Sequence, residues 1–161
     1  MESNEAVADL WLRRVLRDFP EQTEHFLATE RDPFRNPAGH TLRHALGILL
    51  DELLLESDAA RATAGLDSLM QLRAVQDGPP SSALRFLFQL KDILRVHCQD
   101  ADLSLLSSRI DQMALQAFDL FMKYRERICQ ARANEARRRV FTLEKRMNAD
   151  DLTHWQNRGG H

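Results

Sequence analysis

The stretch ADLSLLSSRIDQMALQAFDLFMKYRERICQARANEARRR, residues 101–139, decides the fold, because it holds no Pro or Gly that would break a helix. A straight helix of this length would measure over about 50 Å, which is more than a small domain covers. Its second half, from Lys123 to Arg139, is mostly charged, so we expect it to project or to pair with another chain. Its apolar residues alternate at intervals of three and four, as on one helix face: Leu103, Leu106, Ile110, Met113, Ala117, Leu120 and Tyr124.

Apolar periodicity predicts five further helices, over residues 6–18, 21–28, 38–56, 59–76 and 80–98. The links RDPFRNPAG (31–39) and DGPPS (77–81) interrupt the pattern. Asn36 should cap the helix after the first link, with Phe34 plugging that link into the core. Ser57-Asp58 and Asp100 should cap the two helices that follow them, and Gly65 should mark a close contact between helices.

These elements predict an all-α fold, a globin-like or related bundle of about five to six helices with a long protruding C-terminal helix. We expect residues 1–147 to form one helical domain and residues 148–161 a mobile polar tail. Phe26 and Leu27 should anchor the short helix 21–28.

Composition narrows the function classes. The chain has 161 residues, and its 22 Lys and Arg nearly balance its 24 Asp and Glu, which argues against nucleic acid as the main partner. The two cysteines lack CxxC spacing, and no apolar run approaches the roughly 20 residues of a membrane span. We therefore expect a cytoplasmic protein with reduced thiols.

Few residues suggest a cofactor. His40 and His44 lie four apart and could share a helix face, but two histidines supply too few ligands for a zinc site. His97 lies on the predicted apolar face of helix 80–98, as a core histidine or a proximal haem ligand would. No phosphate-binding loop and no activated nucleophile appears, so we predict no cofactor, no metal and no enzyme. A haem-binding or other cofactor-binding globin-like sensor is the alternative.

Two sets of residues are the candidates for function. The first set consists of polar side chains in apolar surroundings, which must be paired when buried. We expect this set to hold the two links against the bundle through a structural network, with a ligand-sensing pocket as the alternative. Its members are Arg31, Asp32, Asn36, Arg73, Gln76, Asp77 and Arg95. The second set would form the dimer contact and output surface of the long helix: Phe118, Phe121, Met122, Arg125, Ile128 and Glu135.

Three stretches together resemble one family: RDPFRNPAGHTLRHAL (31–46), LRAVQDGPPSSALRFLFQLKDILR (72–95) and RIDQMALQAFDLFMKYRERICQARANEARRR (109–139). They are similar to the RsbRD-type N-terminal domain, the sensory half of RsbT co-antagonist proteins in bacterial stressosome signalling. The resemblance covers roughly residues 26–139. It implies an all-helical, non-enzymatic sensor or interaction domain, and related domains are globin-like dimers without haem. In multidomain relatives the module precedes a STAS domain or a histidine kinase, with the charged helix end as output linker.

The chain departs from the family in two places. Gly78-Pro79 stands where the family carries an aromatic and a small polar residue. The sequence also ends soon after the long helix, so we expect output to pass through a separate protein or a dimer. The resulting expectation is a bacterial regulatory module, a homodimer that binds a partner protein or a small signal and relays it through residues 101–139. Neither a membrane nor nucleic acid is expected as a partner.

Overall fold

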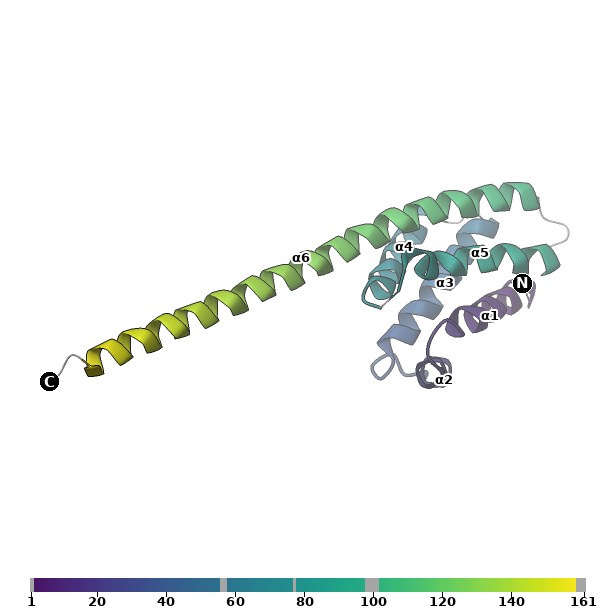
Figure 1. The fold of residues 1–161 in the computed structure, drawn as a ribbon. Helices are drawn as coiled ribbons and strands as arrows, with labels where there is room; N and C mark the ends of the chain where they lie inside the picture. Colours follow the sequence, from purple (N-terminus) through teal and green to yellow (C-terminus); the bar gives the residue numbers. More distant parts are fainter. Residues whose placement is uncertain (1, 56–57, 77, 98–101, 159–161) are drawn as a thin grey trace. The chain divides into compact units, whose positions relative to one another are not determined.

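The computed structural model describes residues 2–55, 58–76, 78–97 and 102–158, with side chains from residue 4 to residue 149 within these ranges. The described residues form six helices and no strand (Figure 1). The predicted all-α fold is therefore confirmed. The helices are α1 (Glu2–Leu16), α2 (Glu21–Thr29), α3 (Pro37–Leu55), α4 (Ala59–Ala74), α5 (Pro80–His97) and α6 (Leu103–Arg158).

The chain divides into two compact units, Met1–Tyr124 and Arg125–His161. The first unit holds α1 to α5 and the start of α6, and the second holds the rest of α6. No helix among the described residues is long and apolar enough to cross a membrane.

The core of the first unit is built from the leucine-rich faces of α3, α4 and α5. Trp11 brings α1 into this core: its side chain is fully buried, and its ring stacks on Phe86 of α5 with centroids 5.9 Å apart. The Trp11 indole N–H donates to the Phe86 carbonyl at 2.7 Å, so the one polar atom of this buried side chain is satisfied.

Gly65 marks the close packing of α4 on α3 that the sequence predicts. A Cβ at Gly65 would lie 3.7 Å from the backbone of Ala45, an ordinary van der Waals contact. Both residues are buried. A larger side chain here would separate the two helices.

The first part of α6 closes the core. Leu106, Ile110 and Ala117 of the predicted apolar face are buried, and Phe121 is buried beside them. Polar contacts then tie α6 to three other helices: Lys91 of α5 to Asp111 at 2.6 Å, Arg109 to the Leu53 carbonyl of α3 at 3.3 Å, and Tyr124 to Asp67 of α4 at 2.7 Å.

Helix caps agree with the sequence where the structure describes them. Asn36 and Asp58 each accept a backbone N–H in the first turn of the next helix, from Gly39 and Arg61. Asp100 lies outside the described residues. Asp102 caps α6 instead, because its carboxylate accepts the backbone N–H groups of residues 104 and 105.

Three expectations about apolar positions are wrong. Phe34 does not plug its link into the core, because it is 96% exposed. Phe26 is also largely exposed, so Leu27 alone anchors α2. His97 is exposed at the end of α5 and is not part of its buried face. Phe34 lies in the link and His97 is the last residue of α5, and neighbouring elements cover neither side chain, while the core side of the short helix α2 is Leu27 and not Phe26.

The long helix continues beyond the residues that the sequence assigns to it. Helix α6 extends to Arg158, so residues 148–158 are helical. The division into a domain of residues 1–147 and a mobile tail stays a prediction.

Candidate signalling and interaction site

Asn36 holds the first link together. Its side chain is 1% exposed, and its Oδ1 accepts the Gly39 N–H at 2.8 Å. Its Nδ2 donates to the Glu30 carbonyl at 2.9 Å and lies 3.4 Å from the Leu27 carbonyl. One side-chain amide therefore provides hydrogen-bond partners for backbone groups at the start of α3 and at the end of α2, where helices leave such groups without partners.

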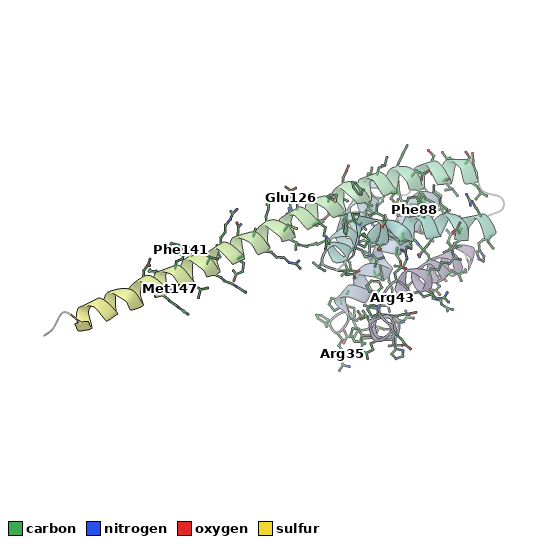
Figure 2. All side chains as sticks on the ribbon, viewed as in Figure 1. Arg35, Arg43, Phe88, Glu126, Phe141 and Met147 are labelled. Carbon is green, nitrogen blue, oxygen red and sulfur yellow. The ribbon has the colours of Figure 1, made fainter. Side chains whose placement is uncertain are left out.

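Arg43 reinforces the same junction from α3. Its guanidinium donates to the carbonyls of Leu27 and Ala28, near the C-terminal end of α2. Arg43 is labelled in Figure 2. A positive charge is favourable there because the helix dipole is negative at that end. Burial lowers the pKa of Arg43, and the nearby charge of Arg31 lowers it further. The sequence did not single out Arg43, and its position in a run of leucines and histidines gave no signal for this role.

The link itself is a tight turn. The Asp32 carboxylate accepts the Phe34 N–H at 2.9 Å, and the Asp32 carbonyl accepts the Asn36 N–H at 2.8 Å. Arg31 is exposed. The structure therefore brings Asp32 and Asn36 together, with Phe34 presented at the surface.

Arg73 is the centre of a second cluster, which joins α4 to the end of α1 and the start of α5. Its side chain is 4% exposed and forms an ion pair with Asp18 at 3.5 Å. It also donates to the Gln76 side chain at 3.2 Å and to the Ser82 carbonyl at 3.4 Å. The guanidinium carbon lies 5.0 Å from the centroid of the Phe19 ring.

The charge balance of this cluster explains why Arg73 can be buried. Burial lowers the pKa of Arg73, while the Asp18 carboxylate raises it by attraction and hydrogen bonding. Asp18 also lies 3.6 Å from the more exposed Arg85. A buried arginine keeps its charge and must be paired, and Asp18 supplies the partner. The sequence did not single out Asp18, because its 55 residues of separation from Arg73 leave no local pattern.

Not all of the other residues of the predicted network lie in the cluster around Arg73. Gln76 contacts Arg73 directly. Arg95 lies on the exposed end of α5 and pairs with Asp92 at 3.8 Å, so it is not part of either cluster. Asp77 lies outside the described residues.

The second unit carries an exposed apolar stripe on α6. Val140, Leu143 and Met147 are 54%, 58% and 67% exposed. Together with the smaller exposed side chains before them they recur at steps of four, three, four, three and four, the spacing of a coiled-coil seam. We call this set the α6 stripe: Cys129, Ala133, Ala136, Val140, Leu143 and Met147.

Of the predicted dimer residues, the first unit holds three. Phe118 and Met122 are each 44% exposed, so both present apolar surface. Phe121 is 1% exposed and lies in the unit's own core, which removes it as a dimer contact.

The remaining predicted dimer residues lie in the second unit. Arg125 and Ile128 are half-buried. Glu135 accepts from Arg139 at 3.0 Å on the same helix, a pair of the i, i+4 kind that supports an exposed helix. These residues lie beside the α6 stripe rather than in it.

Two of the candidate cofactor residues, His40 and His44, lie side by side on α3. His40 and His44 are exposed on α3, with their rings parallel and 6.1 Å apart. Within the described ranges, no group of three or more His, Cys, Asp or Glu side chains could hold a metal ion.

Comparison with known proteins identifies the family. Neither a curated protein nor a solved structure matches the chain. The family model described as the RsbT co-antagonist protein rsbRD N-terminal domain matches residues 5–136, which include both polar clusters and the first part of α6. The chain therefore belongs to the rsbRD N-terminal domain family of RsbT co-antagonist proteins.

Proposed function

We propose that this chain is a non-enzymatic, cytoplasmic regulatory module that forms a homodimer along α6. In this role it binds a partner protein or a small signal through its helical bundle and relays the event along the long helix. The family suggests a stressosome-related regulatory domain. The observation that carries the dimer is the α6 stripe, because it leaves three large apolar side chains more than half exposed.

The stripe needs a partner helix for a physical reason. In globular proteins most helical stability comes from packing an apolar face rather than from intrinsic propensity. The Glu135–Arg139 pair of the second unit joins side chains of one helix and does not cover the stripe. A second copy of the same stripe would bury the apolar side chains of both chains at once.

Flanking charges favour a parallel arrangement. In coiled-coil terms the stripe occupies positions a and d, which puts Arg132, Arg139 and Arg146 at position g. An antiparallel pair would set this row of arginines against its copy. In a parallel pair, Arg139 of one chain would instead lie opposite Glu144 of the other, five residues further along, and this contact is attractive. Only Arg132 would lie opposite a residue of like charge, Arg137, and this contact is repulsive.

The test compares two substitutions within one turn of α6, on different sides of the helix. Leu143→Glu places a charge in the stripe, whereas Phe141→Glu places one outside it; Leu143 is 58% exposed and Phe141 is 67% exposed. We expect the wild-type chain to be a dimer at 10 μM in sedimentation experiments. Leu143→Glu should weaken dimerisation at least tenfold and Phe141→Glu by less than threefold. A wild-type monomer at 100 μM, or equal effects of the two substitutions, would contradict the proposal.

Cys129 reports the orientation. A Cys98→Ser variant leaves Cys129 as the sole thiol of the chain. A parallel, in-register dimer brings the two Cys129 residues opposite each other, so mild oxidation should cross-link the chains. An antiparallel dimer would separate them, and the same dimer would then stay uncross-linked.

A further inference from the structure

A cleft of about 290 Å³ lies in the first unit where α3, α4 and α6 meet. Its apolar wall includes Leu53, Leu66 and Met113, of which the two leucines are buried. Small-molecule sites typically occupy about 300–1,000 Å³ with a mostly apolar lining and a few polar groups. An apolar cavity of about 150 Å³ is enough for benzene. The cleft therefore has room for one substituted ring.

The charged side chains of the cleft already have structural tasks. Arg109 donates to the Leu53 carbonyl at 3.3 Å, near the end of α3. Glu52 accepts the Asp58 backbone N–H at 2.6 Å, just before α4. These two residues carry one positive and one negative charge, so the lining as a whole is neutral. A charged ligand would find no net opposite charge there.

Two glutamines provide the polar groups that are open to a ligand. Gln112 and Gln116 lie four residues apart on α6, line the cleft and are both exposed. Neither side-chain amide bonds to another side chain or backbone group in the part of the chain that the structure describes. A carboxamide both donates and accepts hydrogen bonds. The best complement to a pair of them is a group that also does both, such as an amide.

We propose that this cleft binds a small uncharged molecule with an apolar ring or chain and an amide-like polar edge. The apolar part would lie against Leu53, Leu66 and Met113, and the polar edge against Gln112 and Gln116. Such a ligand would touch three helices and favour the packing of α6 on α3 and α4. That consequence for signalling rests on the proposed function, whereas the binding itself does not.

The probe is 4-ethylbenzamide, titrated into the 161-residue chain while the side-chain amide signals of Gln112 and Gln116 are followed by NMR. A ligand of this size should bind with a dissociation constant of about 1 mM. The isosteric anion 4-ethylbenzoate should bind at least fivefold more weakly, because its carboxylate cannot donate a hydrogen bond. Equal or tighter binding of the benzoate, or no saturable shift up to 20 mM benzamide, would overturn the proposal.

A matched pair of variants locates the site. Thr63 and Ala64 are both exposed on α4, and only Thr63 lines the cleft. Thr63→Phe should weaken benzamide binding at least tenfold, and Ala64→Phe should leave it within twofold of wild type. Equal effects of the two would overturn the proposal. If Thr63→Phe does not fold, Gln116→Ala takes its place and should weaken binding at least threefold, with an unchanged affinity again overturning the proposal.

Dimerisation is measured on the same samples by sedimentation. Loss of benzamide binding with an intact dimer would reject this site alone. A monomer that still binds benzamide would reject the proposed dimer alone.

Discussion

Replacing Asn36 with Ala tests whether one buried amide holds the junction between α2 and α3. The substitution removes the acceptor for the Gly39 N–H and the donor to the Glu30 carbonyl. Because Asn36 is 1% exposed, water cannot easily replace either contact. Losing the helix cap costs about 1 kcal/mol, and leaving buried polar groups unsatisfied costs about 1–3 kcal/mol. We expect the free energy of unfolding of the first unit to fall by about 3 kcal/mol.

That loss converts into a measurable change in melting temperature. The first unit has 124 residues, and unfolding entropy near 60 °C is about 2.1 cal/mol/K per residue, so the midpoint should fall by about 11 °C. Thermal unfolding gives this midpoint and urea unfolding gives the free energy, both followed by Trp fluorescence in a Trp155→Phe background. The signal reports on the first unit, because Trp11 then remains as the sole tryptophan and is fully buried in its core.

Two further variants separate the roles of the amide. Asn36→Asp keeps the acceptor for Gly39 but replaces the donor with a carboxylate facing the Glu30 carbonyl, so we expect a loss of about 2 kcal/mol or more. Arg35→Ala changes an exposed neighbour and should stay within about 0.5 kcal/mol of wild type. A loss below about 1 kcal/mol for Asn36→Ala, or wild-type stability for Asn36→Asp, would refute the reasoning.

Three more substitutions probe other contacts by the same unfolding assay. Arg73→Met leaves Asp18 with Arg85 as its one other described ionic partner, so it should cost about 2 kcal/mol, less than for a fully buried pair because the Asp18 side chain is 16% exposed; an unchanged midpoint would contradict this. Gly39→Ala should cost about 2 kcal/mol, because its Cβ would overlap the Asn36 amide; little or none of this loss should appear in an Asn36→Ala background. Tyr124→Phe removes the 2.7 Å hydrogen bond to Asp67 and should cost about 1 kcal/mol, whereas a stabilised variant would show that the bond contributes nothing.

Helices were the part of the fold that the sequence predicted well. Each of the six helices overlaps its predicted range, because Pro and Gly links interrupt an otherwise clear apolar period. The cap at Asn36 was predictable for the same reason, since an Asn before a Pro is a local signal. Its contact with Glu30 was not predictable, because it depends on how α2 turns back onto α3.

The sequence could not predict which polar residues far apart in the chain contact each other. Arg73 was recognisable as a polar residue in an apolar helix, but Asp18 was not recognisable as its partner. Arg95 looked equivalent in sequence and lies at the exposed end of its helix instead, 67% exposed in its side chain. Periodicity tells which face a side chain occupies and not which element covers that face.

Helix α6 shows the same limit on a larger scale. Its sequence has two apolar patterns: one that includes Leu106, Ile110 and Ala117, and the stripe that ends in Val140, Leu143 and Met147. Both have coiled-coil spacing, yet the first is buried in its own unit and the second is more than half exposed at its three largest side chains. Spacing alone therefore cannot separate a face that completes a bundle from a face that needs a second chain. Exposure makes that distinction, which is why the proposed dimer rests on the α6 stripe and not on Phe121.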